Sequence, residues 1–117
     1  MNVLLVVNDA PYGSEKAYNA LRLAMALQRE QEGVEVHVFL LADAVTCALP
    51  DQATPQGYYN IERMVKAVLQ KEGLVKACGT CIEARGLKKL DLIEGAEVST
   101  MSQLTQCVVD SDKVLTF

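Results

Sequence analysis

The fold is decided by residues 3–14, whose sequence is VLLVVNDAPYGS. The first five residues are aliphatic without interruption, which is typical of a parallel strand that is buried on both faces. A proline and a glycine then break the pattern, and the hydroxyl of Ser14 predicts the N-cap of a helix. A buried strand, a turn and the start of a helix thus follow one another directly.

Strand and helix patterns alternate along the rest of the chain. Further strands are predicted at 34–41, 74–78, 96–98 and 113–117. Helices are predicted from apolar residues at helical spacing over 17–27 and 61–69, from a capping box at Thr100 and Gln103, and over the short segment 80–85. Residues 46–59 lack periodicity and form a long loop. We therefore predict one α/β domain over 1–117, with a five-stranded, mostly parallel sheet and helices on both faces.

Composition and charge exclude several classes of protein. Half of the 117 residues are apolar, and the formal net charge is -4 without a basic cluster, so nucleic acid is not expected as a partner. No segment approaches the ~20 apolar residues of a membrane span. The N-terminal apolar run has no basic segment before it, which predicts a strand and not a signal peptide. We expect a cytoplasmic protein.

The motif Cys78-Gly79-Thr80-Cys81 is the strongest candidate for chemistry. Sheets of this class bind ligands at the carboxyl ends of their strands, and Cys78 falls where the third strand ends. A helix that begins there would favour a thiolate, which is the nucleophilic form of cysteine. Thiols stay reduced in the cytosol, so the pair indicates redox, sulfur or metal chemistry rather than a structural disulfide.

Polar residues near the ends of other strands are candidates for the same site. The turn over 8–14 could present backbone N–H groups to a small anion, and Arg85 could stabilise a thiolate at Cys78. We predict Cys78 and Cys81 as the reactive residues. The predicted substrate-binding residues are Asn8, Tyr12, Ser14, Asp43, Thr80 and Arg85. Plainer roles are open for several of them, because Asn8 and Asp43 are also common turn and cap residues.

Three alternatives apply to the cysteine motif. Two ordinary core cysteines are the plainest. A zinc site needs four ligands, usually from two such pairs, whereas Cys47, Cys107 and His37 are single, so no metal is predicted. In thioredoxin-type oxidoreductases the motif follows the first strand and opens a long helix, unlike the arrangement here. No glycine-rich nucleotide fingerprint is present, and no cofactor is expected.

Several ordered motifs resemble the DsrE/DsrF-like family, in its YchN-type branch. They are NDAPYGSE at 8–15, FLLADAV at 39–45, GYYN at 57–60, CGTC at 78–81 with Arg85-Gly86, and DKVLTF at 112–117. The resemblance covers essentially the whole chain. It implies a flavodoxin-like three-layer fold and a homo-oligomer, in this branch a hexamer.

The resemblance also implies a role for Cys78. Relatives in the TusBCD and DsrEFH complexes pass sulfane sulfur along cysteine persulfides, and their working cysteine follows the third strand, as Cys78 does. Cys81 belongs to this branch and not to the relay proteins in general. The chain is thus predicted to be a sulfurtransferase-like sulfur carrier between donor and acceptor proteins. The alternative is a non-enzymatic oligomeric protein that binds a small ligand or a partner between Asn8, Asp43 and Cys78.

Overall fold

Five strands form one sheet in the computed structural model, which describes residues 1–117. The strands are β1 (Asn2–Val7), β2 (Glu35–Leu40), β3 (Leu74–Cys78), β4 (Glu97–Ser99) and β5 (Lys113–Thr116). The helices are α1 (Lys16–Glu30), α2 (Ile61–Gln70), α3 (Gly79–Ala84) and α4 (Met101–Asp110), with a 3₁₀ helix, η1 (Ala42–Ala48), after β2. Each strand lies within one residue of its predicted bounds.

All neighbouring strands run parallel, in the order β4-β3-β2-β1-β5. The predicted α/β class with a five-stranded parallel sheet is confirmed. The order differs in detail from the 2-1-3-4-5 order of flavodoxin itself. Here the chain moves outward from β1 through β2, β3 and β4, and then returns to place β5 on the other side of β1. The reversal therefore falls between β1 and β5, two strands away from Cys78.

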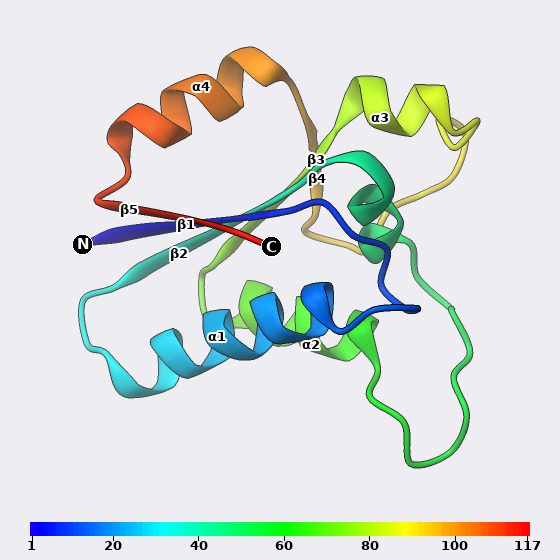
Figure 1. Ribbon diagram of the computed structural model, residues 1–117, viewed down its shortest axis with the longest axis horizontal. Coiled ribbons are helices and arrows are strands. Elements are labelled where there is room, and N and C mark those ends of the chain that lie inside the picture. Colours follow the sequence, from blue (N-terminus) through cyan, green and yellow to red (C-terminus); the bar gives the residue numbers. More distant parts are fainter.

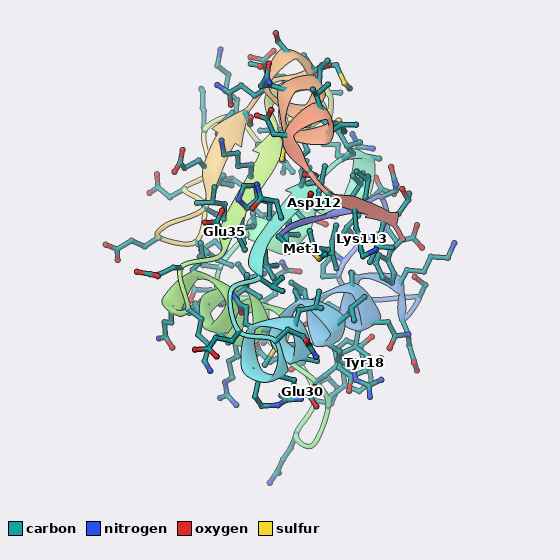
Figure 2. The ribbon with its side chains drawn as sticks, turned by 90° about the vertical axis from the view of Figure 1, so that its left-hand side faces the viewer. Met1, Tyr18, Glu30, Glu35, Asp112 and Lys113 are labelled. Atoms are coloured by element: carbon teal, nitrogen blue, oxygen red, sulfur yellow. The ribbon has the colours of Figure 1, made fainter.

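Helices cover both faces of the sheet. α1 and α2 pack against each other on one face, whereas α3 and α4 lie on the other (Figure 1). A view from the strand starts shows α4 and α1 on opposite sides of the sheet, with Met1 close to Asp112 and Lys113 (Figure 2). The amide of Asn2 donates to Oδ2 of Asp112 at 2.7 Å, which joins the start of β1 to the start of β5.

Strand β1 forms the centre of the core. Val3 to Val7 are all buried, because strands flank β1 on both sides and helices cover both of its faces. α1 contributes small buried side chains, Ala17, Ala20 and Ala24, which let the helix lie close to the sheet. The aliphatic run from which this strand was predicted is therefore explained by burial on both faces.

The segment after β2 differs from the prediction. Residues 42–48 form the 3₁₀ helix η1. Its last three residues, 46–48, were predicted to be the start of the long loop. Ala44, Val45, Cys47 and Ala48 are buried, so packing against the sheet stabilises a helix whose sequence has no regular apolar period. Residues 49–60 are irregular, as predicted. The sequence missed η1 because tertiary burial, not local propensity, holds it.

Helix starts show one correct and one incorrect prediction. Thr100 caps α4, and its hydroxyl accepts from the Gln103 amide at 3.2 Å, as predicted. Ser14 was predicted to cap α1, but Glu15 occupies the N-cap. The Ser14 hydroxyl donates to Oδ2 of Asp9 at 2.8 Å and accepts a long hydrogen bond, 3.4 Å, from the Lys16 amide at the start of the helix. The longest helix, α1, has 15 residues. No helix combines the length and apolarity that would let it cross a membrane.

The central position of β1 gives a test of the core. Leu5 is 0% exposed, whereas Leu90 is 52% exposed. Leu5→Ala should lower the free energy of unfolding by about 2–5 kcal/mol, because it removes buried methyl groups and leaves a cavity. Leu90→Ala is the matched control and should change it by less than about 1 kcal/mol. Urea unfolding measures both, and equal effects would contradict the assignment of the core.

Candidate functional site

Cys78 is both the last residue of β3 and the residue that caps α3. Its sulfur accepts a hydrogen bond from the backbone N–H of Cys81 at 3.4 Å. The thiol therefore replaces the serine or aspartate that usually occupies an N-cap. α3 has six residues, too few for a large helix dipole. Individual hydrogen bonds, and not the predicted dipole, are the main influence of this helix on the thiol.

Gly79 allows the turn between β3 and α3 to lie against β4. A Cβ at this position would come within 3.1 Å of Cγ1 of Val98 and 3.3 Å of the Ser99 carbonyl oxygen. Cys78 and Ser99 are also paired in register. A larger residue at position 79 would therefore crowd β4, and glycine allows Cys78 to lie next to the end of that strand.

Two opposing effects set the pKa of Cys78. The side chain is only 3% exposed, and this burial, the largest single influence, raises the pKa. Hydrogen bonds from the Thr80 hydroxyl at 3.2 Å, from the Cys81 thiol, and from the N–H groups of Cys81 and Thr80 together outweigh it. The net pKa of Cys78 therefore lies below its usual value. Such a thiol is a stronger candidate for a nucleophile than an ordinary buried cysteine.

Cys81 is shifted in the opposite direction. Burial raises its pKa, and so does the hydrogen bond in which it acts as donor to Cys78, while the backbone N–H of Ala42 lowers it. That N–H donates to the Cys81 sulfur at 3.3 Å. Ala42 has a φ of 50°, in the left-handed region, which an alanine adopts at a cost of about 1–2 kcal/mol. The pair therefore consists of one thiol disposed to ionise and one disposed to keep its proton.

Arg85 and Asp43 form an ion pair beside the cysteines. Nε of Arg85 lies 2.9 Å from Oδ1 of Asp43, and its Nη1 donates to the Cys81 carbonyl at 3.1 Å. The charge of Arg85 lowers the pKa of Cys81 and is not among the influences on Cys78. Four predicted residues, Asp43, Thr80, Cys81 and Arg85, thus gather around Cys78. Arg85 was predicted to stabilise a thiolate at Cys78, but its charge acts on Cys81 instead.

The other three predicted residues have partners elsewhere. The Asn8 side chain donates to the Phe117 carbonyl at 3.4 Å. The Tyr12 hydroxyl accepts from the Ile61 amide at 3.0 Å, and its ring stacks on Tyr59. Ser14 donates to Asp9, as described above. The sheet register places Asn8 two strands from Cys78, about 10 Å away. These residues therefore organise the turn after β1 and do not contact the thiols.

The remaining cysteines do not join the motif. Cys47 is 1% exposed, and burial raises its pKa to about 12. Cys107 lies on α4, next to His37. No group of three His, Cys, Asp or Glu side chains comes together in a way that suits a metal ion.

The hydrogen bond from the Ala42 amide to the Cys81 sulfur was not predicted from the sequence. Every residue except proline has a backbone N–H, so its contacts can be predicted only when the local backbone conformation, here the positive φ of Ala42, is also predicted.

The comparisons with known proteins identify the family of the chain. Residues 1–117 match the DsrE/DsrF-like family. The chain is similar to protein YchN of Escherichia coli K12, with 43% identity over 115 residues, covering 98% of this chain and 97% of YchN. It is equally similar to the uncharacterised protein MJ0989 of Methanocaldococcus jannaschii, with 43% identity over 117 residues and 100% of both chains covered.

The comparison of structures gives the same result. The crystal structure of the E. coli ychN protein has a TM-score of 0.94 to this chain and 42% identity, covering 99% of this chain and 98% of that one. A second structure, MTH1491 from Methanobacterium thermoautotrophicum, has a TM-score of 0.80 at 16% identity, covering 99% and 98%. This second likeness shows the fold alone.

The Thr80 hydroxyl provides a test of the thiol's environment. Thr80→Val removes a hydrogen bond to the Cys78 sulfur while keeping the shape of the side chain. The pKa of Cys78 should rise, and alkylation at neutral pH should slow by up to about tenfold, since a hydrogen bond to a charged group contributes about 1.5 kcal/mol. Rates against pH, followed for the Cys78 peptide by mass spectrometry, measure the shift. Thr105→Val, on α4, is the control, and an unchanged profile in Thr80→Val would contradict this account.

Proposed function

This chain belongs to the DsrE/DsrF-like family, and we propose that it is a sulfur carrier in which Cys78 forms a persulfide. The observation that supports this most directly is the environment of the Cys78 sulfur. Hydrogen bonds from Thr80 and Cys81 lower its pKa in spite of burial. A thiolate at the end of β3 can then act as the sulfur acceptor.

The loading step transfers one sulfur atom. The Cys78 thiolate attacks the terminal sulfur of a donor persulfide, a new S–S bond forms at Cys78, and the donor's own S–S bond breaks. The donor cysteine leaves as a thiolate and takes up a proton. The four hydrogen-bond donors around the Cys78 sulfur are placed to stabilise the charge on it before the attack.

Unloading has two routes. An acceptor thiolate can attack the terminal sulfur, which returns Cys78 as a thiolate. Alternatively, Cys81 attacks the inner sulfur, expels sulfide and leaves a Cys78–Cys81 disulfide, which a cellular thiol then reduces. The raised pKa of Cys81 keeps this second route slow until the proton of Cys81 is removed. We infer that the proton on Cys81 delays this loss, so that Cys81 resolves the persulfide only when no acceptor arrives.

Access to Cys78 restricts the partners. With 3% of the residue exposed, the donor and the acceptor must present their sulfur at a narrow opening or displace the first turn of α3. α3 is short and the Thr80 side chain is exposed, so this turn can move at small cost. We propose donor and acceptor proteins with flexible cysteine-bearing ends.

We also propose the cytoplasm as the location, because all four cysteines are free thiols.

Substitution of the two thiols separates the sulfur carrier from its alternatives. Cys78→Ser should abolish persulfide loading, while Cys81→Ser should load normally and hold the sulfur longer, because the resolving thiol is missing. Intact mass after treatment with a persulfide donor, before and after reductant, measures both. A binding protein with a structural cysteine pair predicts no persulfide on the wild type. Equal loading of the wild type and Cys78→Ser would refute the role of Cys78.

We further propose that the chain assembles into a closed homo-oligomer of six. Five of the nine large apolar side chains that are exposed in the single chain lie on β4, α4 and β5. They are Val98, Met101, Val108, Val109 and Val114. Val98 and Val114 lie on the two opposite edge strands of the sheet, and the other three lie on α4. Exposed edge strands are ready sites for contact with another chain. Closed symmetry would cover these surfaces in every subunit.

The assembly is tested at its most exposed apolar residue. Val109 is 74% exposed. Val109→Glu should therefore leave the single chain folded but place a charge in the interface and weaken the assembly. Leu90→Glu, on the loop after α3, is the matched control. Light scattering at micromolar concentration should give six chains for the wild type and for the control, and a monomeric wild type would contradict the proposal.

A further inference from the structure

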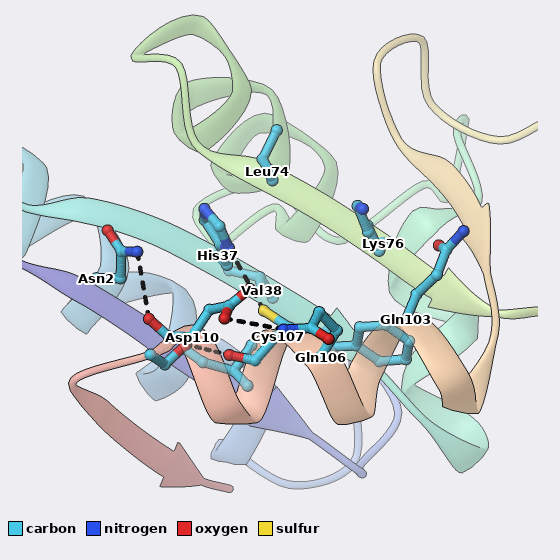
Figure 3. A pocket seen from close by; sticks show the side chains of 12 residues that line it. Asn2, His37, Val38, Leu74, Lys76, Gln103, Gln106, Cys107 and Asp110 are labelled. Atoms are coloured by element: carbon cyan, nitrogen blue, oxygen red, sulfur yellow. Dashed lines mark hydrogen bonds between the residues drawn. The ribbon is translucent and has the colours of Figure 1, made fainter.

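A groove of about 430 Å³ lies on the α4 face of the sheet, away from the Cys78 motif. α4 forms one wall, and the first halves of β1, β2 and β3 form the floor and the other wall (Figure 3). Its volume lies in the range of small-molecule sites. The floor is apolar, from Leu4, Val38 and Phe39, and the polar groups stand along the rim. The groove therefore suits a small molecule with polar ends.

A thiol and an imidazole meet inside this groove. Nδ1 of His37, on β2, lies 3.4 Å from Sγ of Cys107, on α4 (Figure 3). Burial lowers the pKa of His37, Glu35 raises it and Lys76 lowers it further, so the ring is neutral at pH 7. With its ring proton on Nε2, His37 can accept the proton of the thiol. A cysteine beside a neutral histidine is the usual arrangement of an activated thiol.

Opposite charges stand at the two ends of the groove. Lys76, on β3, lies towards Gln103, whereas Asp110, on α4, lies towards Asn2 (Figure 3). Lys76 takes part in no salt bridge. The carboxylate of Asp110 accepts only from the side-chain amide of Gln106, at 2.9 Å, and pairs with no cation, while its backbone carbonyl accepts from the Asn2 side chain at 3.5 Å. A ligand that offers a carboxylate to Lys76 and an ammonium to Asp110 would satisfy both charges.

We propose that this groove is a second thiol site, in which His37 deprotonates Cys107 and the thiolate exchanges with a small zwitterionic disulfide of the cystine class. A carboxylate at one end of the ligand pairs with Lys76 and an ammonium at its other end pairs with Asp110, while the remaining ammonium and carboxylate stay in solvent. This placement brings the S–S bond over the Cys107 sulfur. The site is independent of sulfur transfer at Cys78.

The exchange needs no external oxidant. His37 takes the proton of Cys107, the sulfur of Cys107 attacks one sulfur of the ligand, and the S–S bond of the ligand breaks as the new one forms. The departing thiolate receives the proton from the His37 imidazolium. One disulfide is replaced by another, so Cys107 ends as a mixed disulfide and half of the ligand leaves as a thiol.

A series of disulfides tests the choice of ligand. Cystine, the dication cystamine, the dianion dithiodiglycolate and the neutral 2-hydroxyethyl disulfide carry the same reactive bond with different charges. The readout is the mass of the tryptic fragment that begins at Leu90, since Cys107 is the only cysteine between Lys89 and Lys113. Cystine should modify Cys107 several-fold faster than the neutral disulfide, as two partly exposed ion pairs allow. Rates that follow only the intrinsic reactivity of each disulfide would overturn the choice of ligand.

Two matched variants test the charged ends in opposite directions. Lys76→Gln should remove the preference for a carboxylate and raise the relative rate of cystamine. Asp110→Asn should remove the preference for an ammonium and raise the relative rate of dithiodiglycolate. If neither variant changes the order of the four disulfides, Lys76 and Asp110 do not bind the ligand and the proposal fails.

The role of His37 is tested with His37→Gln, which keeps a hydrogen-bond acceptor near the sulfur but cannot take its proton at neutral pH. Alkylation of Cys107 by iodoacetamide at pH 7 should slow about tenfold, and the rates of wild type and variant should converge above about pH 9, where an unassisted thiol ionises by itself. Glu35, Lys76 and Asp110 are the charged groups around the pair and are unchanged in this variant. The Cys78 peptide from the same digest is the internal control for folding. A merely structural contact predicts no change at pH 7, and that result would overturn the role of His37.

Discussion

The hydrogen bond from the Cys81 amide to the Cys78 sulfur joins the end of the sheet to the cysteine pair. It exists because β3 ends and α3 begins at the same residue, so that the thiol occupies the N-cap. A parallel strand delivers its last side chain to the carboxyl edge of the sheet. The first turn of the helix then supplies N–H groups that have no partner within the helix. If either element were displaced by one residue, the sulfur would lose its donors and remain an ordinary buried thiol.

Burial and hydrogen bonding compete at this site, and the balance differs between the two cysteines. Both thiols are desolvated, which raises both pKa values. Cys78 accepts several hydrogen bonds and finishes below its usual pKa, whereas Cys81 donates to Cys78 and finishes above its own. Opposite shifts of neighbouring titratable groups are the usual way in which a site assigns one group to attack and the other to hold a proton. The Arg85–Asp43 pair holds the Cys81 carbonyl and thus keeps this geometry in place.

Local sequence patterns predicted the strands and most of the helices. The features that were not predicted depend on contacts between distant parts of the chain. The aliphatic run identified β1 because burial on both faces leaves no room for polar residues. The position of Cys78 followed from the end of the strand predicted over 74–78, which is less completely buried. The strand order, η1 and the Ala42 amide depend on packing between distant segments, for which no local pattern exists. Asn8 resembled a site residue because it stands at a strand end, but the C-terminal Phe117 carbonyl takes its side chain.

The His37–Cys107 pair shows the same limit in another form, because its members are 70 residues apart and meet only when α4 packs on the sheet. In the sequence, His37 is a mid-strand histidine and Cys107 a cysteine in a helix, and neither suggests chemistry alone. Alternation along β3 places Leu74, Lys76 and Cys78 on one face of the sheet, so the groove and the Cys78 motif share that face. His37 is paired in register with Leu74, four residues before Cys78, so the two lie about 13 Å apart along the strand direction. The two proposed sites therefore occupy different parts of the same face, and each is proposed with its own reaction partner.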